Sequence, residues 1–257
     1  MSLDLSPKPG SAPRMAMLRS QISMELRLLS RNGEQLLLTL IIPLVLLILG
    51  ARADRIVDLG PGRPIDIITP GILALAVLST SFTSLAIATG FERRYGVIKR
   101  LGASPLPRWG LLVGKIGAIA IIEVIQLAIL SVVGLLLGWE PSGGLTATAE
   151  ALLLVVLGTA AFGSLGLLIA GIMRAEATLA VANLVYVLLL VGGGLIVPLS
   201  RYPEAGSHAL QVLPSGALGQ GLRDVFAGDG LSSFSVVVLI MWAVCCGLGV
   251  SRTFKWE

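Results

Sequence analysis

The chain has 257 residues, of which 55% are apolar and 13% are charged, and its formal net charge at pH 7 is +4. Soluble domains carry roughly 25% charged residues, so this composition excludes an ordinary soluble domain and indicates an integral membrane protein. The basic residues lie beside long apolar runs and lack interleaved aromatic side chains. This arrangement argues against nucleic-acid binding and favours contact with membrane lipid.

The chain begins with a polar segment, residues 1–13, that contains several prolines, and we expect it to be a disordered cytoplasmic leader. Residues 14–33 predict an amphipathic helix, because apolar residues recur at alternating steps of three and four. Those residues are Met15, Leu18, Ile22, Leu26 and Leu29. Arginines between them favour a position along the cytoplasmic membrane interface. The alternative is a simple cytoplasmic extension of the first membrane span.

Residues 34–257 predict an all-α, polytopic domain with six transmembrane helices. A bilayer core requires about 20 residues of apolar helix, and the sequence offers six candidates. They run from Gln35 to Gly50, Ile67 to Phe91, Trp109 to Leu137, Ala149 to Met173, Ala177 to Pro198 and Phe234 to Val250.

The distribution of Lys and Arg sets the orientation of these spans. Of the 19 basic residues, one side holds five, which are Arg52, Arg55, Arg63, Arg201 and Arg223. The other side holds the rest, in the leader, residues 91–115, the turn at Arg174 and the C-terminal tail. Because cytoplasmic loops carry the excess of positive charge, we expect both termini to be cytoplasmic and the protein to lie in the plasma (inner) membrane.

The connection between the second and third candidate spans, residues 91–115, holds six of the basic residues. Residues 92–102 have helical spacing, and the following Ala-Ser-Pro-Leu-Pro run breaks the helix. One interpretation is a short cytoplasmic helix that transmits force. In the other, the charge serves only to anchor two membrane helices.

This connection resembles the signature connection of the ABC-2 type permeases of ABC exporters. The matching residues are Glu92, Gly96, Leu101, Pro105, Leu106, Arg108, Trp109, Gly114 and Lys115. Val97 stands where that family commonly has Thr, and Lys99 where Glu is frequent. A second segment resembles the family's exit segment between the last two spans. Its matching residues are Pro198, Pro203, Leu213, Pro214, Gly221, Leu222 and Arg223.

The resemblance implies that residues 92–102 form a coupling helix seated on an ATP-binding subunit. The residues expected to make that contact are Glu92, Arg93, Arg94, Val97, Ile98, Arg100 and Leu101. It also implies two ATP-binding cassette subunits that carry ATP and magnesium, and a second permease copy or a homologous permease. The largely apolar spans favour an amphiphilic or lipidic substrate for such an exporter, such as a drug, a lipid or a lipid-linked glycan.

Residues 207–227 are interrupted by glycines and by Leu213-Pro214, so we expect two short half-helices that form an outer re-entrant hairpin, with a loop in water as the alternative. The residues assigned to this segment and to an outer gate are Gly193, Pro198, Leu213, Pro214 and Arg223.

Polar residues inside the spans are candidates for the transport pathway, because burial of polar groups in lipid is costly. They are Ser81, Ser84, Glu123, Gln126, Asn183 and Tyr186. Hydrogen bonding between helices is the alternative for each of them.

The chain itself is not expected to bind ATP or a metal. Gly110 to Lys115 lacks the spacing and the hydroxyl of a phosphate-binding loop, and His208 is the only histidine. We therefore expect a transport subunit without its own cofactor. The rival interpretations are an intramembrane enzyme and a secondary transporter without an ATPase partner.

Overall fold

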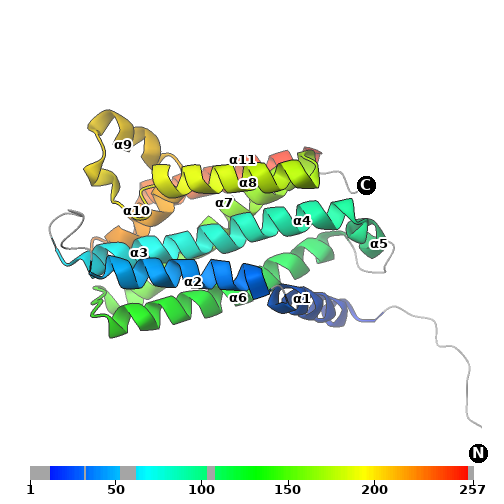
Figure 1. Ribbon diagram of the computed structural model, residues 1–257, viewed down its shortest axis with the longest axis horizontal. Coiled ribbons are helices and arrows are strands. Elements are labelled where there is room, and N and C mark those ends of the chain that lie inside the picture. The colour runs from blue at the N-terminus through cyan, green and yellow to red at the C-terminus, as the bar shows by residue number, and fades with distance from the viewer. Residues whose placement is uncertain (1–11, 32, 53–61, 103–107, 254–257) are drawn as a thin grey trace, which may run out of the picture.

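The computed structural model describes residues 12–31, 33–52, 62–102 and 108–253, and every regular element among them is a helix (Figure 1). The predicted all-α class is confirmed. Most of the leader expected over residues 1–13 lies outside the described residues, as do Pro105 and Leu106 of the signature connection.

Five helical stretches are long and apolar enough to cross a membrane. The first consists of α3 (Pro64–Val77), the π-helical segment η2 (Leu78–Ser84) and α4 (Leu85–Arg94), and the others are α6 (Arg108–Leu136), α7 (Gly144–Ile172), α8 (Ala175–Gly192) and α11 (Ser233–Thr253). The helix α2 (Gly33–Gly50) covers the first predicted span, and the apolar part of it whose side chains are described is Thr39–Gly50. The sixth span therefore stays a prediction.

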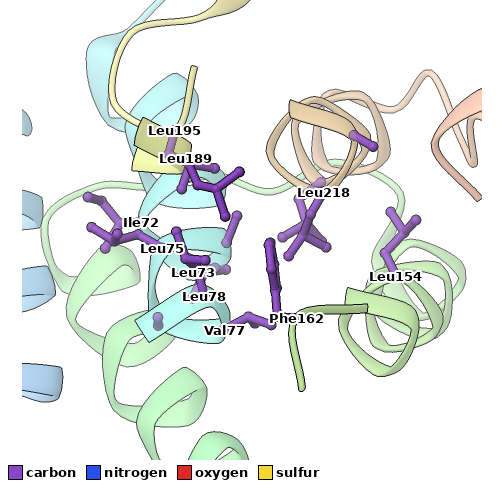
Figure 2. Close-up of a cluster of buried hydrophobic side chains, with 14 of the residues drawn as sticks. Ile72, Leu73, Leu75, Val77, Leu78, Leu154, Phe162, Leu189, Leu195 and Leu218 are labelled. Atoms are coloured by element: carbon purple, nitrogen blue, oxygen red, sulfur yellow. The ribbon is translucent and has the colours of Figure 1, made fainter. Parts of the chain in front are cut away.

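The stretch Pro64–Arg94 is the centre of the bundle. In its most apolar part 83% of the residues are buried inside the protein, against 22% to 33% in the other four stretches. Figure 2 shows how the core forms around it: Leu78 and Val77 lie towards Phe162 of α7, and Leu218 of the helix α10 (Pro214–Ala227) closes the cluster from another side. The outer helices consequently expose apolar faces, as lipid contact requires.

Hydroxyl side chains accompany the π-helical segment in the middle of this central stretch. Ser81 donates a hydrogen bond to the carbonyl of Val77, and the Ser84 hydroxyl lies 3.3 Å from the carbonyl of Ser79. Such bonds satisfy backbone groups that a departure from regular α-helical pairing releases. Ser81 and Ser84 are both buried within the protein.

The helix α1 (Arg14–Arg31) lies within the range 14–33 expected for the amphipathic helix, whose place along a membrane interface stays a prediction. It packs against α6, and the residues that it buries there are Gln21 and Glu25. The predicted apolar stripe is not buried: Met15 is 64% exposed, and Leu18, Ile22, Leu26 and Leu29 are half-buried. The polar pair faces another helix, whereas the apolar residues stay available to lipid.

A layer of short elements covers one end of the bundle: η3 (Leu199–Arg201), α9 (Glu204–Gln211) and α10 (Figure 1). Two helices thus form in the segment predicted to hold two half-helices, although the first begins earlier than expected. The helix α10 packs against both α3 and α7, so it is part of the bundle. The depth of this pair in a bilayer stays a prediction.

The opposite end of the bundle carries α1, the short helix α5 (Val97–Gly102) and the end of α11 (Figure 1). Side chains confirm this grouping, because Glu25 of α1 and Glu92 of α4 bind the same Lys115, and Arg252 of α11 lines one hollow with Arg93 and Arg94. The two ends of the described chain therefore lie at the same end of the bundle (Figure 1).

Candidate functional site

The helix predicted over Glu92–Gly102 is divided into two parts. The helix α4 continues to Arg94, Tyr95 and Gly96 form a turn, and α5 begins at Val97. Gly96 has a φ of 66°, which glycine adopts without steric cost. Glu92, Arg93 and Arg94 therefore form the last turn of the long central stretch, and α5 is a separate helix.

These three consecutive side chains each bind a different part of the bundle. Glu92 accepts a hydrogen bond of 2.7 Å from Lys115 of α6. Arg93 donates to the carbonyls of Ala170 and Met173 at the end of α7.

Arg94 forms an ion pair with Glu176 in the first turn of α8. The end of α4 is thus bonded to α6, α7 and α8 just before the chain enters α5. All three side chains were predicted to contact an ATP-binding subunit, and all three bind within this chain.

A buried charge cluster, consisting of Glu25, Glu92, Lys115 and Gln21, joins α1 to the same point. The ammonium of Lys115 lies 3.1 Å from a carboxylate oxygen of Glu25 and 2.7 Å from one of Glu92. Gln21 donates a 2.9 Å hydrogen bond to the other oxygen of Glu25. The side chains of Lys115, Glu25 and Glu92 are only 12%, 6% and 18% exposed. The cluster places two carboxylates against one ammonium.

The buried charge cluster explains why glycine and lysine stand at positions 114 and 115 of the signature connection. A Cβ atom on Gly114 would lie 2.3 Å from Cγ of Gln21, so only glycine allows α1 to approach α6 this closely. Lys115 then reaches both carboxylates. Sequence reasoning missed Glu25 and Gln21, although a lone acidic residue four positions after a glutamine, in a helix whose other charges are all basic, is a usable signal.

The helix α5 exposes the side chains of Lys99 and Arg100, whereas Val97 and Leu101 are half-buried. The side chain of Ile98 lies outside the described residues, as do those of Arg108 and Trp109. The exposed side chains that the structure describes on α5 are therefore both basic.

The polar pair Glu123 and Gln126 is buried inside the bundle, with 2% and 4% of each residue exposed. The Thr159 hydroxyl of α7 lies 2.8 Å and 2.9 Å from the two carboxyl oxygens of Glu123. Gln126 accepts a 2.6 Å bond from Thr80 and donates to the carbonyl of Thr39 in α2. Each residue therefore links α6 to neighbouring helices.

The structure does not bring the six candidate pathway residues together. Ser81 and Ser84 lie in the core beside Gln126's partner Thr80, whereas Asn183 is exposed on α8 and Tyr186 is half-buried. The Asn183 side chain makes no hydrogen bond to another described residue. A polar amide thus lies on an exposed apolar face.

Arg223 holds the segment of the predicted outer gate against the central helix. Its guanidinium donates to the carbonyl of Ile67 at 3.1 Å and to that of Leu195 at 2.8 Å. Burial lowers the pKa of Arg223 to about 10, partly offset by the negative charge of Asp224, so the side chain remains charged at neutral pH.

The other residues assigned to the gate lie around this contact. Gly193 ends α8 and approaches Ser215 so closely that a Cβ atom there would lie 2.1 Å from the serine hydroxyl oxygen. Leu213 caps α10 and Pro214 occupies its first turn, where proline costs no hydrogen bond. Pro198 precedes η3. The segment is closely packed, and its opening stays a prediction.

Comparison with known proteins gives a family for this architecture. Residues 17–227 match the family model described as ABC-2 type transporter. The chain belongs to the ABC-2 type transporter family. A relative from Bacillus subtilis (strain 168), named "Putative transport permease YvfS", is 25% identical over 175 residues, which cover 65% of this chain and 68% of the relative.

Family membership makes this chain a membrane-embedded transport permease of an ABC transporter and a transport subunit, with ATP-binding cassette subunits as the general partners of its class. The family model spans α1 from Met17 onward, the signature connection and α10.

Proposed function

We propose that this chain is one permease half of an ATP-driven exporter that moves an amphiphilic or lipidic substrate out across the plasma membrane. Two ATP-binding subunits bind ATP and magnesium, and both termini of the permease are cytoplasmic. The observation that carries this proposal is the attachment of α5: the three residues that end α4 are bonded to α6, α7 and α8.

This attachment explains how a motor acting on α5 would move the bundle. A short helix on a loose loop absorbs a push by bending its linker. Here the chain leads from α5 into α4 through a turn of only Tyr95 and Gly96, and α4 is bonded to three neighbours. Displacement of α5 therefore moves the cytoplasmic ends of several helices together, because packed elements shift as units.

The ATP-binding subunit is proposed to sit on the exposed basic side of α5. Lys99 and Arg100 provide orienting charges, and Leu101 contributes apolar contact at the edge of the helix. Glu92, Arg93 and Arg94 do not form this surface; they hold the end of α4 to α6, α7 and α8.

A second permease copy is proposed to cover the exposed face of α8. That face presents Asn183 among large apolar side chains that are 51% to 60% exposed, namely Leu184, Val187, Leu188 and Val191. An amide facing lipid is unfavourable, whereas a hydrogen bond across two helices stabilises membrane association. The substrate path then lies between the two permease halves.

The experiment is ATP-driven transport of fluorescent lipid analogues by the complex purified with its ATP-binding subunits and reconstituted in vesicles. Leu101→Asp introduces a charge at the proposed contact and is expected to abolish transport, because burial of an unpaired charge costs several kcal/mol. The matched variant Arg100→Glu changes an exposed charge and is expected to reduce transport modestly.

Both variants are first checked for membrane insertion and a monodisperse complex. Transport at the wild-type rate by correctly inserted Leu101→Asp would refute the role of α5. Transport that needs no nucleotide would refute the exporter proposal.

A further inference from the structure

A cleft of about 330 Å³ lies between α1, α4, the turn before α5, and α6. Its walls are mostly apolar, formed by Leu28 and Leu29 of α1, Leu85, Ala88 and Phe91 of α4, and Ile119 of α6. The volume is at the lower end of the range of small-molecule sites, roughly 300–1,000 Å³. The proposed permease contact on α8 does not involve this cleft.

The cleft is polar at one end and apolar at the other. Glu25, Glu92 and Lys115 of the buried charge cluster line it near the α5 end, beside the exposed Tyr95. Leu85 and Ile119 are buried together at the deep end. From Glu92 in α4 to Ser84 at the end of η2, this wall extends about 12 Å, at about 1.5 Å per residue.

The charges at the polar end do not balance within the cluster. Lys115 carries one positive charge against the carboxylates of Glu25 and Glu92, and Gln21 adds only a neutral donor. The nearest arginines of α4 are directed elsewhere, since Arg93 binds α7 and Arg94 binds Glu176. With both carboxylates ionised, one net negative charge remains in a site that is largely shielded from water, where a cation is strongly favoured.

We propose that this cleft binds a cationic single-chain amphiphile drawn from the cytoplasmic leaflet. The ammonium headgroup binds the carboxylates of Glu92 and Glu25, and the first part of the chain lies against Leu85, Ala88 and Ile119. The inference rests on the proposed export function and deepens it by naming the chemical class of the substrate. It also places the ligand against α4, directly behind α5.

The binding test uses the full-length permease alone in nanodiscs of zwitterionic lipid. Two probes share one alkyl chain and one fluorophore and differ only in an ammonium or a sulfonate headgroup. We expect the ammonium probe to bind at least about tenfold more tightly, the factor that about 1.4 kcal/mol provides. Equal affinity for the two probes would overturn the proposal.

Three variants separate charge, shape and folding. Glu92→Gln is expected to remove the preference for the ammonium probe. Ala88→Phe fills the cleft without changing any charge and is expected to weaken binding of the ammonium probe about tenfold. Glu150→Gln, on α7 outside the cleft, is the matched control and is expected to bind like the wild type.

Each outcome separates this inference from the export proposal. Wild-type affinity for the ammonium probe in Ala88→Phe would overturn the assignment of the cleft as the binding site, even if the assembled complex transports that probe. Binding that follows the predictions, with no ATP-driven transport of the probe, would refute the export function and leave the binding site in place. A correctly folded Glu92→Gln that retains the full headgroup preference would also overturn the assignment of the carboxylates.

Discussion

Replacement of Lys115 by methionine should release α1 from the bundle. The substitution shortens the unbranched side chain by one atom and removes the only cation of the buried charge cluster. Glu25, 6% exposed, and Glu92, 18% exposed, then lack a counter-charge. Breaking a buried ion pair by removing one partner costs about 3–5 kcal/mol. Because Glu92 retains some contact with water, we expect a value near about 3 kcal/mol.

Undocking of α1 relieves this cost, because Glu25 then reaches water. A penalty of about 3 kcal/mol corresponds to roughly a hundredfold rise in the population with α1 undocked. Hydrogen exchange of the backbone amides of Arg14–Arg31, measured in nanodiscs, reports that population directly. We expect faster exchange throughout α1 and little change in the core of α7.

Two controls define the refuting result. Arg94→Gln breaks an exposed pair, whose partners are 50% and 63% exposed, and such pairs contribute under about 1 kcal/mol. The combined variant Glu25→Gln, Glu92→Gln and Lys115→Met leaves no unpaired charge and should restore much of the protection of α1. Exchange in Lys115→Met that is no faster than in Arg94→Gln would refute the account of the cluster.

Three further predictions concern the opposite end of the bundle and the orientation. Arg223→Met should lower the free energy of unfolding by about 1–3 kcal/mol, because the carbonyls of Ile67 and Leu195 lose a buried charged donor. The measurement is a melting curve in detergent, and an unchanged curve would contradict this. Gly71→Ala should destabilise by about 1–3 kcal/mol, since its Cβ would lie 1.9 Å from the Leu195 carbonyl oxygen, whereas the control Gly206→Ala meets no atom within 4 Å and should melt normally. In a cysteine-free background, a cysteine at Thr253 should react with an impermeant maleimide only in opened cells and one at Gly62 in intact cells; the reverse pattern would overturn the proposed orientation.

The helices were largely predictable because their signals are local. Apolar length defines the stretches that became Pro64–Arg94, α6, α7, α8 and α11, and the steps of three and four predict α1. The break at Gly96 was not predicted, because residues 92–102 have helical spacing throughout. Gly96, which has a positive φ, divides them. The break follows from the bonds that hold the end of α4 to α6, α7 and α8, which local spacing does not reveal.

The partners of the charged residues could not be predicted from the sequence. Glu92, Arg93 and Arg94 read as a surface for another subunit, yet the bundle brings Lys115, the end of α7 and Glu176 to them. The sequence likewise does not predict which way the polar residues inside the spans face. Glu123 and Gln126 face inwards while Asn183 faces outwards, although the spacing argument is the same for both spans, because only packing decides which face is covered.

The position of α10 was also outside the reach of local patterns. Its glycines suggested an interrupted segment, but they allow close contact: a Cβ on Gly221 would lie 3.1 Å from side-chain atoms of both Leu154 and Ser235. Small residues therefore mark a tightly packed helix here.

Photo-crosslinking from α5 tests the central proposal most directly. A photoreactive amino acid replaces the exposed Arg100 in the permease, and the complex is irradiated in native membranes and purified by a tag on the permease. The account predicts a crosslink to an ATP-binding subunit from this position and none from Asp229, which lies after α10 at the opposite end of the bundle. Crosslinks to that subunit from Asp229 but not from Arg100 would contradict both the orientation and the role of α5.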